Sequence, residues 1–129
     1  AYDDTTDILS VPTIDFGTGG SRQLTSNTVT AATGASIIAS TFDGTVCRSC
    51  KYTLQITNNT SSEYQQTEIL AIHNGTNLYI TVYANIYTGA SALGNFSGTY
   101  AANTGTITFA PAIPANNYTI ETIEWLTEI

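Results

Sequence analysis

The chain has 129 residues, a length that suits one domain with a single hydrophobic core. Its 3 basic and 10 acidic residues give a net charge of −7. This charge opposes binding to nucleic acid or to an anionic membrane, because both need clustered lysine and arginine. The sequence has no apolar run of about 18 residues, so we expect no membrane-spanning helix.

The amino-acid composition predicts an all-β fold. Threonine is abundant, there are 8 tyrosines and 10 glycines, methionine is absent, and long helix-forming side chains are few. Charged residues make up only 10% of the chain, so Thr, Ser and Asn must solvate most of the surface. We therefore predict an antiparallel β-sandwich of jelly-roll-like type with almost no helix.

The first part of the chain lacks the alternating pattern of the rest. Residues 1–35 are rich in Asp, Thr, Gly, Ser and Ala and are interrupted by Pro12 and by the glycine-rich run 17–20. We predict an extended N-terminal arm over residues 1–35, which can add a strand to the sheet of a neighbouring subunit. The alternatives are a disordered tail or a strand of the chain's own sandwich. Candidate interface residues in the arm are its isolated apolar side chains, Ile8, Leu9, Val11, Ile14 and Phe16.

The sandwich domain is predicted over residues 36–129. Expected strands follow one another at 36–42, 47–57, 63–73, 77–87, 95–100, 104–110 and 117–126, a spacing typical of a sandwich. In the second of these, Cys50, Tyr52, Leu54 and Ile56 share one face. The third is apolar on both faces near its end, which predicts a central strand with other groups packed on either side.

A hairpin is predicted around Asn74-Gly75. The dipeptide stands between two alternating segments, and both residues tolerate the positive φ of a type I′ turn. In the segment after the turn, strict alternation directs Leu78, Ile80, Val82, Ala84 and Ile86 to the core. The same alternation places Tyr79, Tyr83 and Tyr87 on one exposed face. Such a stripe suits a subunit interface or a stacking platform for sugar, unless neighbouring groups cover it.

Cys47 and Cys50 form a Cys-x-x-Cys pattern, which can mark a redox pair or half of a zinc site. On a strand, however, residues three apart are about 10 Å apart, beyond the roughly 7 Å that a disulfide can bridge. A zinc site needs about four ligands, and His73 is the only histidine. We predict two free thiols, with Cys50 in the core and Cys47 on the opposite face.

No other pattern indicates a catalytic, metal or cofactor site. His73 precedes the hairpin turn without a Gly-x-Ser-x-Gly motif anywhere, so we assign it to local hydrogen bonding or packing. The glutamates are scattered over predicted strands. The cluster Asp3, Asp4 and Asp7 lacks the glycine and terminal glutamate of a calcium loop. We therefore expect no enzymatic activity, no cofactor and no bound metal.

Several short motifs occur together in a family-specific order. They are Arg48-Ser49-Cys50-Lys51-Tyr52, the run 68–76, Tyr83, Thr88-Gly89, Leu93-Gly94-Asn95-Phe96, Phe109-Ala110-Pro111 and Asn117-Tyr118-Thr119-Ile120. This order resembles a β-sandwich domain of tailed-phage virion structural proteins, especially of phages that infect cyanobacteria. The resemblance runs from about Thr41 to the C-terminus and does not cover residues 1–36. Cys50 stands where the pattern usually has alanine, and Val82 where it often has an acidic residue.

The resemblance implies a virion structural protein without catalytic residues. We predict a capsid decoration or cement protein on the outer surface of the phage particle, which binds the head through the arm and the sandwich. Its expected partners are further copies of itself, with a trimer favoured, and the major capsid protein or other virion proteins. The alternative is a tail or fibre module that binds a host glycan receptor through exposed tyrosines and hairpin loops.

Overall fold

The computed structural model describes residues 2–3, 8–9, 14–15 and 22–129, and within these ranges the regular structure is all strand. Three two-residue strands come first: β1 (Tyr2–Asp3), β2 (Ile8–Leu9) and β3 (Ile14–Asp15). They are followed by eight longer strands. These are β4 (Arg22–Ala32), β5 (Ile37–Asp43), β6 (Cys47–Asn58), β7 (Glu63–His73), β8 (Leu78–Tyr87), β9 (Gly94–Ala101), β10 (Thr104–Pro111) and β11 (Tyr118–Glu128).

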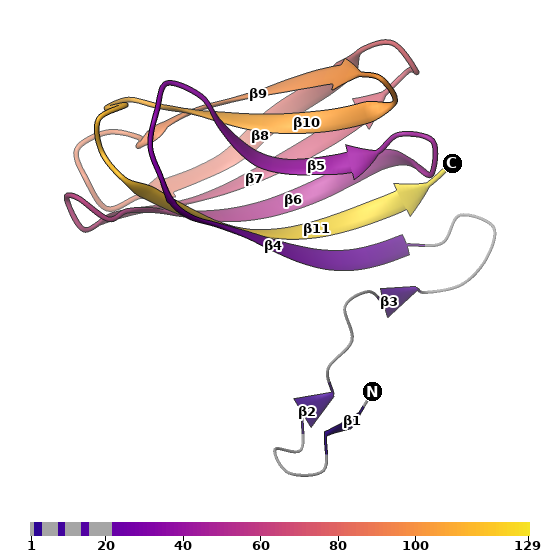
Figure 1. Cartoon of the computed structure of the whole chain (residues 1–129), viewed down its shortest axis with the longest axis horizontal. Coiled ribbons are helices and arrows are strands. Elements are labelled where there is room, and N and C mark those ends of the chain that lie inside the picture. The colour runs from indigo at the N-terminus through magenta and orange to yellow at the C-terminus, as the bar shows by residue number, and fades with distance from the viewer. Residues whose placement is uncertain (1, 4–7, 10–13, 16–21) are drawn as a thin grey trace.

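The strands form two stacked antiparallel sheets, which confirms the predicted β-sandwich (Figure 1). The larger sheet has the order β3-β4-β11-β6-β7-β8, and the smaller has the order β5-β10-β9. A separate pair, β1 with β2, lies clear of the sandwich in Figure 1. The described residues contain no helix that is long and apolar enough to cross a membrane.

All seven strands predicted from residue 36 onward are present, with ends within two residues of expectation. Strand β7 lies between β6 and β8, as its apolar sequence predicted. Period-two alternation explains this success, because each strand turns one row of apolar side chains toward the opposite sheet. In β6 this row is Cys50, Tyr52, Leu54 and Ile56, and each of these side chains is at most 3% exposed.

The core fills the space between the inner faces of the two sheets. Its largest fully buried apolar side chains are Tyr52, Leu54, Ile56, Ile69, Ile107, Phe109, Tyr118 and Ile120. Phe109 is the centre of an aromatic cluster, with ring centroids 5.1 Å from Phe96 and 5.5 Å from Tyr118. Since Phe96 and Phe109 belong to the smaller sheet and Tyr118 to the larger, these rings join the two layers.

Residues 22–32 belong to the sandwich rather than to the arm predicted over residues 1–35. They form strand β4, which pairs along its length with β11 and so belongs to the larger sheet. This outcome corresponds to the alternative, a strand of the chain's own sandwich. Few apolar residues occur in this segment, so its strand was hard to detect. Of the residues before β4, only three pairs of neighbours are described, and the arm itself stays a prediction.

The two ends of the sandwich differ in what they carry. One end, here called the four-loop end, gathers loops 33–36, 59–62, 88–93 and 112–117. Backbone hydrogen bonds join these loops, including Gly34 N–H to Pro114 O at 3.0 Å and Ala112 N–H to Leu93 O at 2.8 Å. The opposite end, called the terminal end, carries loops 44–46, 74–77 and 102–103. There the start of β4 and the end of β11 lie side by side, in the register Arg22 with Thr127.

The hairpin predicted at Asn74-Gly75 is present, but its turn is not type I′. His73 pairs with Leu78, which leaves a four-residue loop in which Gly75 has a φ of +91° and Asn74 has no positive φ. The Asn74 side chain instead closes the loop, because its Oδ1 accepts hydrogen bonds from the backbone N–H groups of Thr76 at 2.9 Å and Asn77 at 2.8 Å.

A two-residue turn of the predicted kind lies in another hairpin. Ala101 pairs with Thr104 across β9 and β10, and the two residues between them are Ala102 and Asn103. Their φ values are +50° and +61°. Positive φ at both central residues is the signature of a type I′ turn. An alanine adopts the left-handed conformation here, although the sequence signal for such a turn stands at Asn74-Gly75.

Candidate functional site

The outer face of the larger sheet is the most apolar exposed surface among the described side chains. The residues on it that are both large and exposed are Tyr64, Leu70, Ile72, Tyr79, Tyr83, Ile86, Ile123 and Trp125. Strand β7 shows the contrast between the faces. Ile69 and Ala71 are buried against the smaller sheet, whereas Leu70 is 46% and Ile72 is 50% exposed. The prediction that β7 is packed on both faces is therefore wrong for the described part of the chain.

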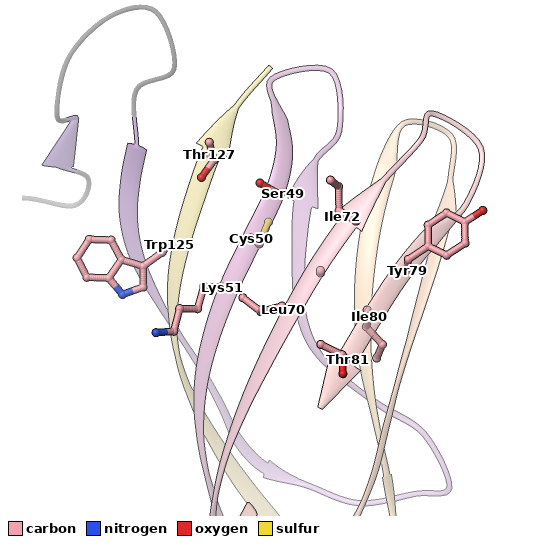
Figure 2. A pocket seen from close by; sticks show the side chains of 11 residues that line it. Ser49, Cys50, Lys51, Leu70, Ile72, Tyr79, Ile80, Thr81, Trp125 and Thr127 are labelled. Carbon is pink, nitrogen blue, oxygen red and sulfur yellow. The ribbon is translucent and has the colours of Figure 1, made fainter. Parts of the chain in front are cut away.

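A shallow groove of about 780 Å³ crosses this outer face near the terminal end (Figure 2). Strands β6, β7, β8 and β11 all contribute to its lining. Tyr79 and Trp125 lie at its two sides, with Leu70 and Ile72 between them (Figure 2). Among the lining residues, Lys51 is the only one with a charged side chain. The groove therefore combines an apolar floor with a single positive charge.

A second, smaller hollow of about 390 Å³ lies on the same face and is lined mainly by polar side chains. Its lining includes Thr53, Gln55, Gln66 and Glu121. The outer face thus changes from apolar near the terminal end to hydroxyl- and amide-rich further along the sheet. Exposed apolar side chains gathered in this way on one face are typical of contact surfaces rather than of freely solvated sheets.

A β-bulge in β8 separates the three tyrosines that were predicted to share a face. Ile69 pairs with Val82, but Glu68 pairs with Ala84, so Tyr83 is the extra residue of the bulge. Beyond it the alternation reverses. Tyr87 pairs with Gln65, whose side chain is buried, and residues paired across strands share a face.

The prediction of one tyrosine stripe is therefore wrong. Tyr79 precedes the bulge and lines the groove on the outer face, where it is 55% exposed. Tyr83 lies on the same face and hydrogen-bonds to the carboxylate of Glu68, a contact that raises the pKa of the tyrosine hydroxyl. Tyr87 is directed to the side of the buried network around Gln65. Whether any of these tyrosines contacts a partner stays a prediction.

The candidate interface residues of the arm are only partly described. Ile8 and Leu9 form β2 and pair with Asp3 and Tyr2. Ile14 is in β3, opposite Leu24 of β4. Val11 and Phe16 lie outside the described residues. Of the described positions, Ile14 is kept away from the groove within this chain, since β3 lies beyond β4 at the edge of the sheet that is farther from the groove.

A second bulge places both cysteines on the inner face. Thr127 pairs with Ser49 and Glu128 with Cys47, so Arg48 is the extra residue of β6. The prediction of opposite faces for Cys47 and Cys50 is therefore wrong, because the bulge reverses the alternation between them. Both thiols are free, as predicted, and both are buried. Burial raises the pKa of Cys47 and raises that of Cys50 to about 12.

His73 has the local hydrogen-bonding and packing role that was predicted. Its Nδ1 accepts a hydrogen bond from the N–H of Gly75 at 3.0 Å, and its Nε2 lies 2.7 Å from the carbonyl oxygen of Cys47. An accepting Nδ1 requires Nε2 to carry the proton and donate it. The ring is 3% exposed and both nitrogens are engaged, so His73 offers no free base to a substrate.

A buried polar network was not predicted. The Gln65 side chain is 2% exposed; its Oε1 accepts from Leu93 N–H at 2.6 Å, and its Nε2 donates to Thr67 Oγ1 at 2.9 Å. Thr67 Oγ1 in turn donates to Asn85 Oδ1 at 2.5 Å. The network fixes loop 88–93 to strands β7 and β8. Alternation could have suggested that Gln65 points inward, but not which backbone group it satisfies.

Asparagine side chains hold the four-loop end together. Asn59 Nδ2 donates to Asn117 Oδ1 at 2.6 Å and to Thr119 Oγ1 at 2.9 Å, and Asn117 Nδ2 donates to Ala31 O at 3.2 Å. Loops 59–62 and 112–117 are thereby fixed to each other, to the start of β11 and to the end of β4. Within the described residues, no group of three or more His, Cys, Asp or Glu side chains is arranged to hold a metal ion.

Comparison with known proteins identifies the fold. No family model and no curated protein sequence matches the chain. Among solved structures it is similar to the tailspike protein of Acinetobacter phage vB_ApiP_P1, with 18% sequence identity and a TM-score of 0.52, over 78% of this chain and 21% of that one. The chain therefore corresponds to about a fifth of the length of that tailspike. At this identity the similarity shows a shared β-sandwich fold.

Two further tailspikes align more weakly. The tailspike of Acinetobacter baumannii phage AM24 has 7% identity and a TM-score of 0.46, over 81% of this chain and 25% of that one. The tailspike gp49 of Acinetobacter baumannii bacteriophage Fri1, described as a capsular polysaccharide depolymerase, has 9% identity and a TM-score of 0.47, over 92% of this chain and 21% of that one.

Proposed function

We propose that the chain is a β-sandwich module of a phage tail spike or tail fibre, that it forms homo-oligomers, and that it acts through contact surfaces rather than catalysis. The observation that carries the proposal is the fold shared with part of a phage tailspike over most of this chain. Capsid decoration, the main prediction from the sequence, gains no support from this likeness, and the tail or fibre alternative fits it better. The narrower link to phages of cyanobacteria stays a prediction.

The surface of the module supports a role in assembly. Leu70, Ile72 and Tyr79 are each about half exposed on the outer face of the larger sheet. Burying the exposed half of one such side chain stabilises a complex by about 0.7–1.5 kcal/mol, half the value for a fully exposed side chain, and a specific interface needs roughly 800 Å² per partner. A net charge of −7 keeps the free chain soluble, while the low charge of the groove reduces repulsion between copies at that place.

The proposal is tested by asking whether the chain takes part in attachment of the phage to its host. Fab fragments raised against the folded chain are added to phage particles that carry it, and adsorption to host cells is measured. We expect adsorption to fall in proportion to Fab occupancy, because a tail spike or fibre stands between the particle and the cell. Fab fragments that saturate the particle without changing adsorption would contradict an attachment role.

A direct contact with host glycan is a second candidate, favoured by the Tyr83–Glu68 pair. The carboxylate of Glu68 hydrogen-bonds to the phenol of this exposed aromatic ring on the outer face, and an exposed aromatic ring offers a flat apolar surface on which a sugar can stack. The experiment is a glycan array with the full chain and with Tyr83→Ala, using Tyr64→Ala as the control because Tyr64 is similarly exposed. Binding by the parent chain that Tyr83→Ala alone removes supports this candidate, and an array without any hit counts against it.

A further inference from the structure

We propose that the outer-face groove is the docking site for the N-terminal segment, residues 1–21, of a second copy of this chain. The inference deepens the proposed self-association and rests on it, because it names the surface and the segment through which copies are joined. It starts from two features that match each other: an apolar groove with one lysine, and a segment that carries apolar and acidic side chains.

The groove needs an apolar occupant. Its floor exposes Leu70 and Ile72 at 46% and 50%, and Tyr79 at its side is 55% exposed. Strands β11, β6 and β7 beneath the groove floor are each paired on both sides, so an occupant of the floor would bind through side chains rather than by adding a strand. The volume of about 780 Å³ accommodates several side chains of an extended peptide.

The N-terminal segment has the complementary composition. Within residues 1–21 the apolar side chains of Ile8, Leu9, Val11, Ile14 and Phe16 are spread along the sequence. The same 21 residues contain Asp3, Asp4, Asp7 and Asp15 and no lysine, arginine or histidine. Lys51, the one charged residue that lines the groove, therefore meets charge of the opposite sign. Such a pair orients two partners and disfavours the wrong ones.

The path of the chain favours a second copy over the chain's own groove. Residues 14–15 pair with β4 on the side away from β11, whereas the groove lies on β11, β6, β7 and β8. Before them, β1 and β2 pair with each other away from the sandwich (Figure 1). The described strands β1, β2 and β3 thus lie away from this chain's own groove. With residues 14–15 paired to β4, the 13 residues before them reach at most about 45 Å when fully extended, enough to meet the groove of a neighbour.

The experiment uses full-length variants with one added cysteine each. One population carries Ile72→Cys in the groove, and the second carries Leu9→Cys, Val11→Cys or Ile14→Cys in the segment. The two are mixed and oxidised, and disulfide-linked heterodimers are measured over time. Cys47 and Cys50 are buried in the folded chain, so they contribute little background. Ile113→Cys, which is 54% exposed in a loop of the four-loop end, replaces Ile72→Cys as the matched control.

We expect the cysteine at one or more of the segment positions to form a disulfide with the Ile72→Cys variant about tenfold faster than with the Ile113→Cys variant, because docking raises the local concentration of the two thiols. Lys51→Glu should slow that reaction, and reversing the charge of Asp7 with Asp7→Lys in the segment should restore it. Equal rates at both cysteines for all three segment positions would overturn the inference. A fast disulfide within one monomer, when both cysteines are in the same chain, would overturn it as well.

Sedimentation of the unmodified chain distinguishes failure of self-association from failure of docking at the groove. A chain that stays monomeric at every concentration contradicts the self-association in the proposed function. A chain that associates, but whose segment shows no preference for Ile72→Cys, leaves the proposed function standing and refutes the groove as the docking site.

Discussion

The imidazole of His73 stacks on the ring of Tyr100, with centroids 4.5 Å apart and planes inclined by 16°. His73 ends β7 in the larger sheet and Tyr100 lies in β9 of the smaller, so the stack joins the two layers at the terminal end. The same imidazole bonds to Gly75 N–H and to the Cys47 carbonyl. One side chain thereby fixes the hairpin loop, the start of β6 and the spacing of the sheets.

Removing the ring nitrogens of His73 should destabilise the fold. His73→Phe keeps an aromatic ring against Tyr100 but leaves the carbonyl of Cys47 and the N–H of Gly75 without their side-chain partner. We expect the free energy of unfolding in urea to fall by about 2 kcal/mol. Thr76→Ala in the same loop is the control and should change it by less than about 0.5 kcal/mol. Equal stability of His73→Phe and the parent chain would show that these hydrogen bonds contribute nothing.

The Gln65 network offers a pair of neighbouring residues for comparison. Gln65→Leu removes the acceptor of the Leu93 N–H and should lower the free energy of unfolding by about 2 kcal/mol. Gln66→Leu alters the exposed neighbour on the opposite face, and its effect should stay within about 0.5 kcal/mol. Denaturant titration of both variants tests the difference. If Gln66→Leu proved the more damaging change, the assignment of faces in β7 would be wrong.

The turn at Ala102 and Asn103 predicts a substitution that stabilises the chain. Because Ala102 has a φ of +50°, Ala102→Gly should raise the free energy of unfolding by about 0.5–1 kcal/mol. Gly75→Ala should act in the opposite direction, since Gly75 has a φ of +91°. Ala101→Gly, which alters the adjacent strand residue, is the control and should destabilise. A loss of stability in Ala102→Gly would contradict the left-handed conformation of that residue.

The cysteines predict a dependence of stability on alkaline pH. The pKa of Cys50 is raised in the folded chain from 9.0 to about 12, and that of Cys47 is raised too, chiefly by burial. Unfolded thiols therefore lose protons at lower pH than folded ones. Stability from this source is complete below pH 9 and declines as pH rises toward 12. We expect Cys47→Ala/Cys50→Ala to show a shallower decline than the parent chain in urea titrations between these pH values.

Thiol labelling provides an independent check of cysteine burial. Alkylation at pH 8, followed by mass spectrometry, should modify neither cysteine in the folded chain and both in urea, because the reactive species is the thiolate. Rapid labelling of Cys47 without denaturant would place it on the exposed face that the sequence pattern predicted.

Alternation predicted the strands well because each strand has one face toward the opposite sheet. The run Cys50, Tyr52, Leu54 and Ile56 is a clear example, with all four side chains buried as expected. Strand β4 was predicted only as an alternative to the arm because its sequence, RQLTSNTVTAA, has few apolar residues to alternate. Its position depends on pairing with β11, which is distant in the chain.

Two single-residue bulges explain why the predicted faces failed at particular positions. Arg48 in β6 reverses the expected face of Cys47, and Tyr83 in β8 moves Tyr87 away from Tyr79. An alternating pattern carries no mark of an extra residue, because the bulge depends on the register of the partner strand. The groove was not predicted because its lining combines the consecutive strands β6, β7 and β8 with β11, which is distant in the sequence and joins them only by pairing with β6.

A location on the phage tail is tested most directly by electron cryomicroscopy of phage particles that carry this chain, with density assigned by fitting the sandwich. A module of a tail spike or fibre predicts this density on the tail and its appendages, in copies related by the symmetry of that structure. Regular density over the capsid shell, with none on the tail, would contradict the proposal and restore the capsid-decoration prediction.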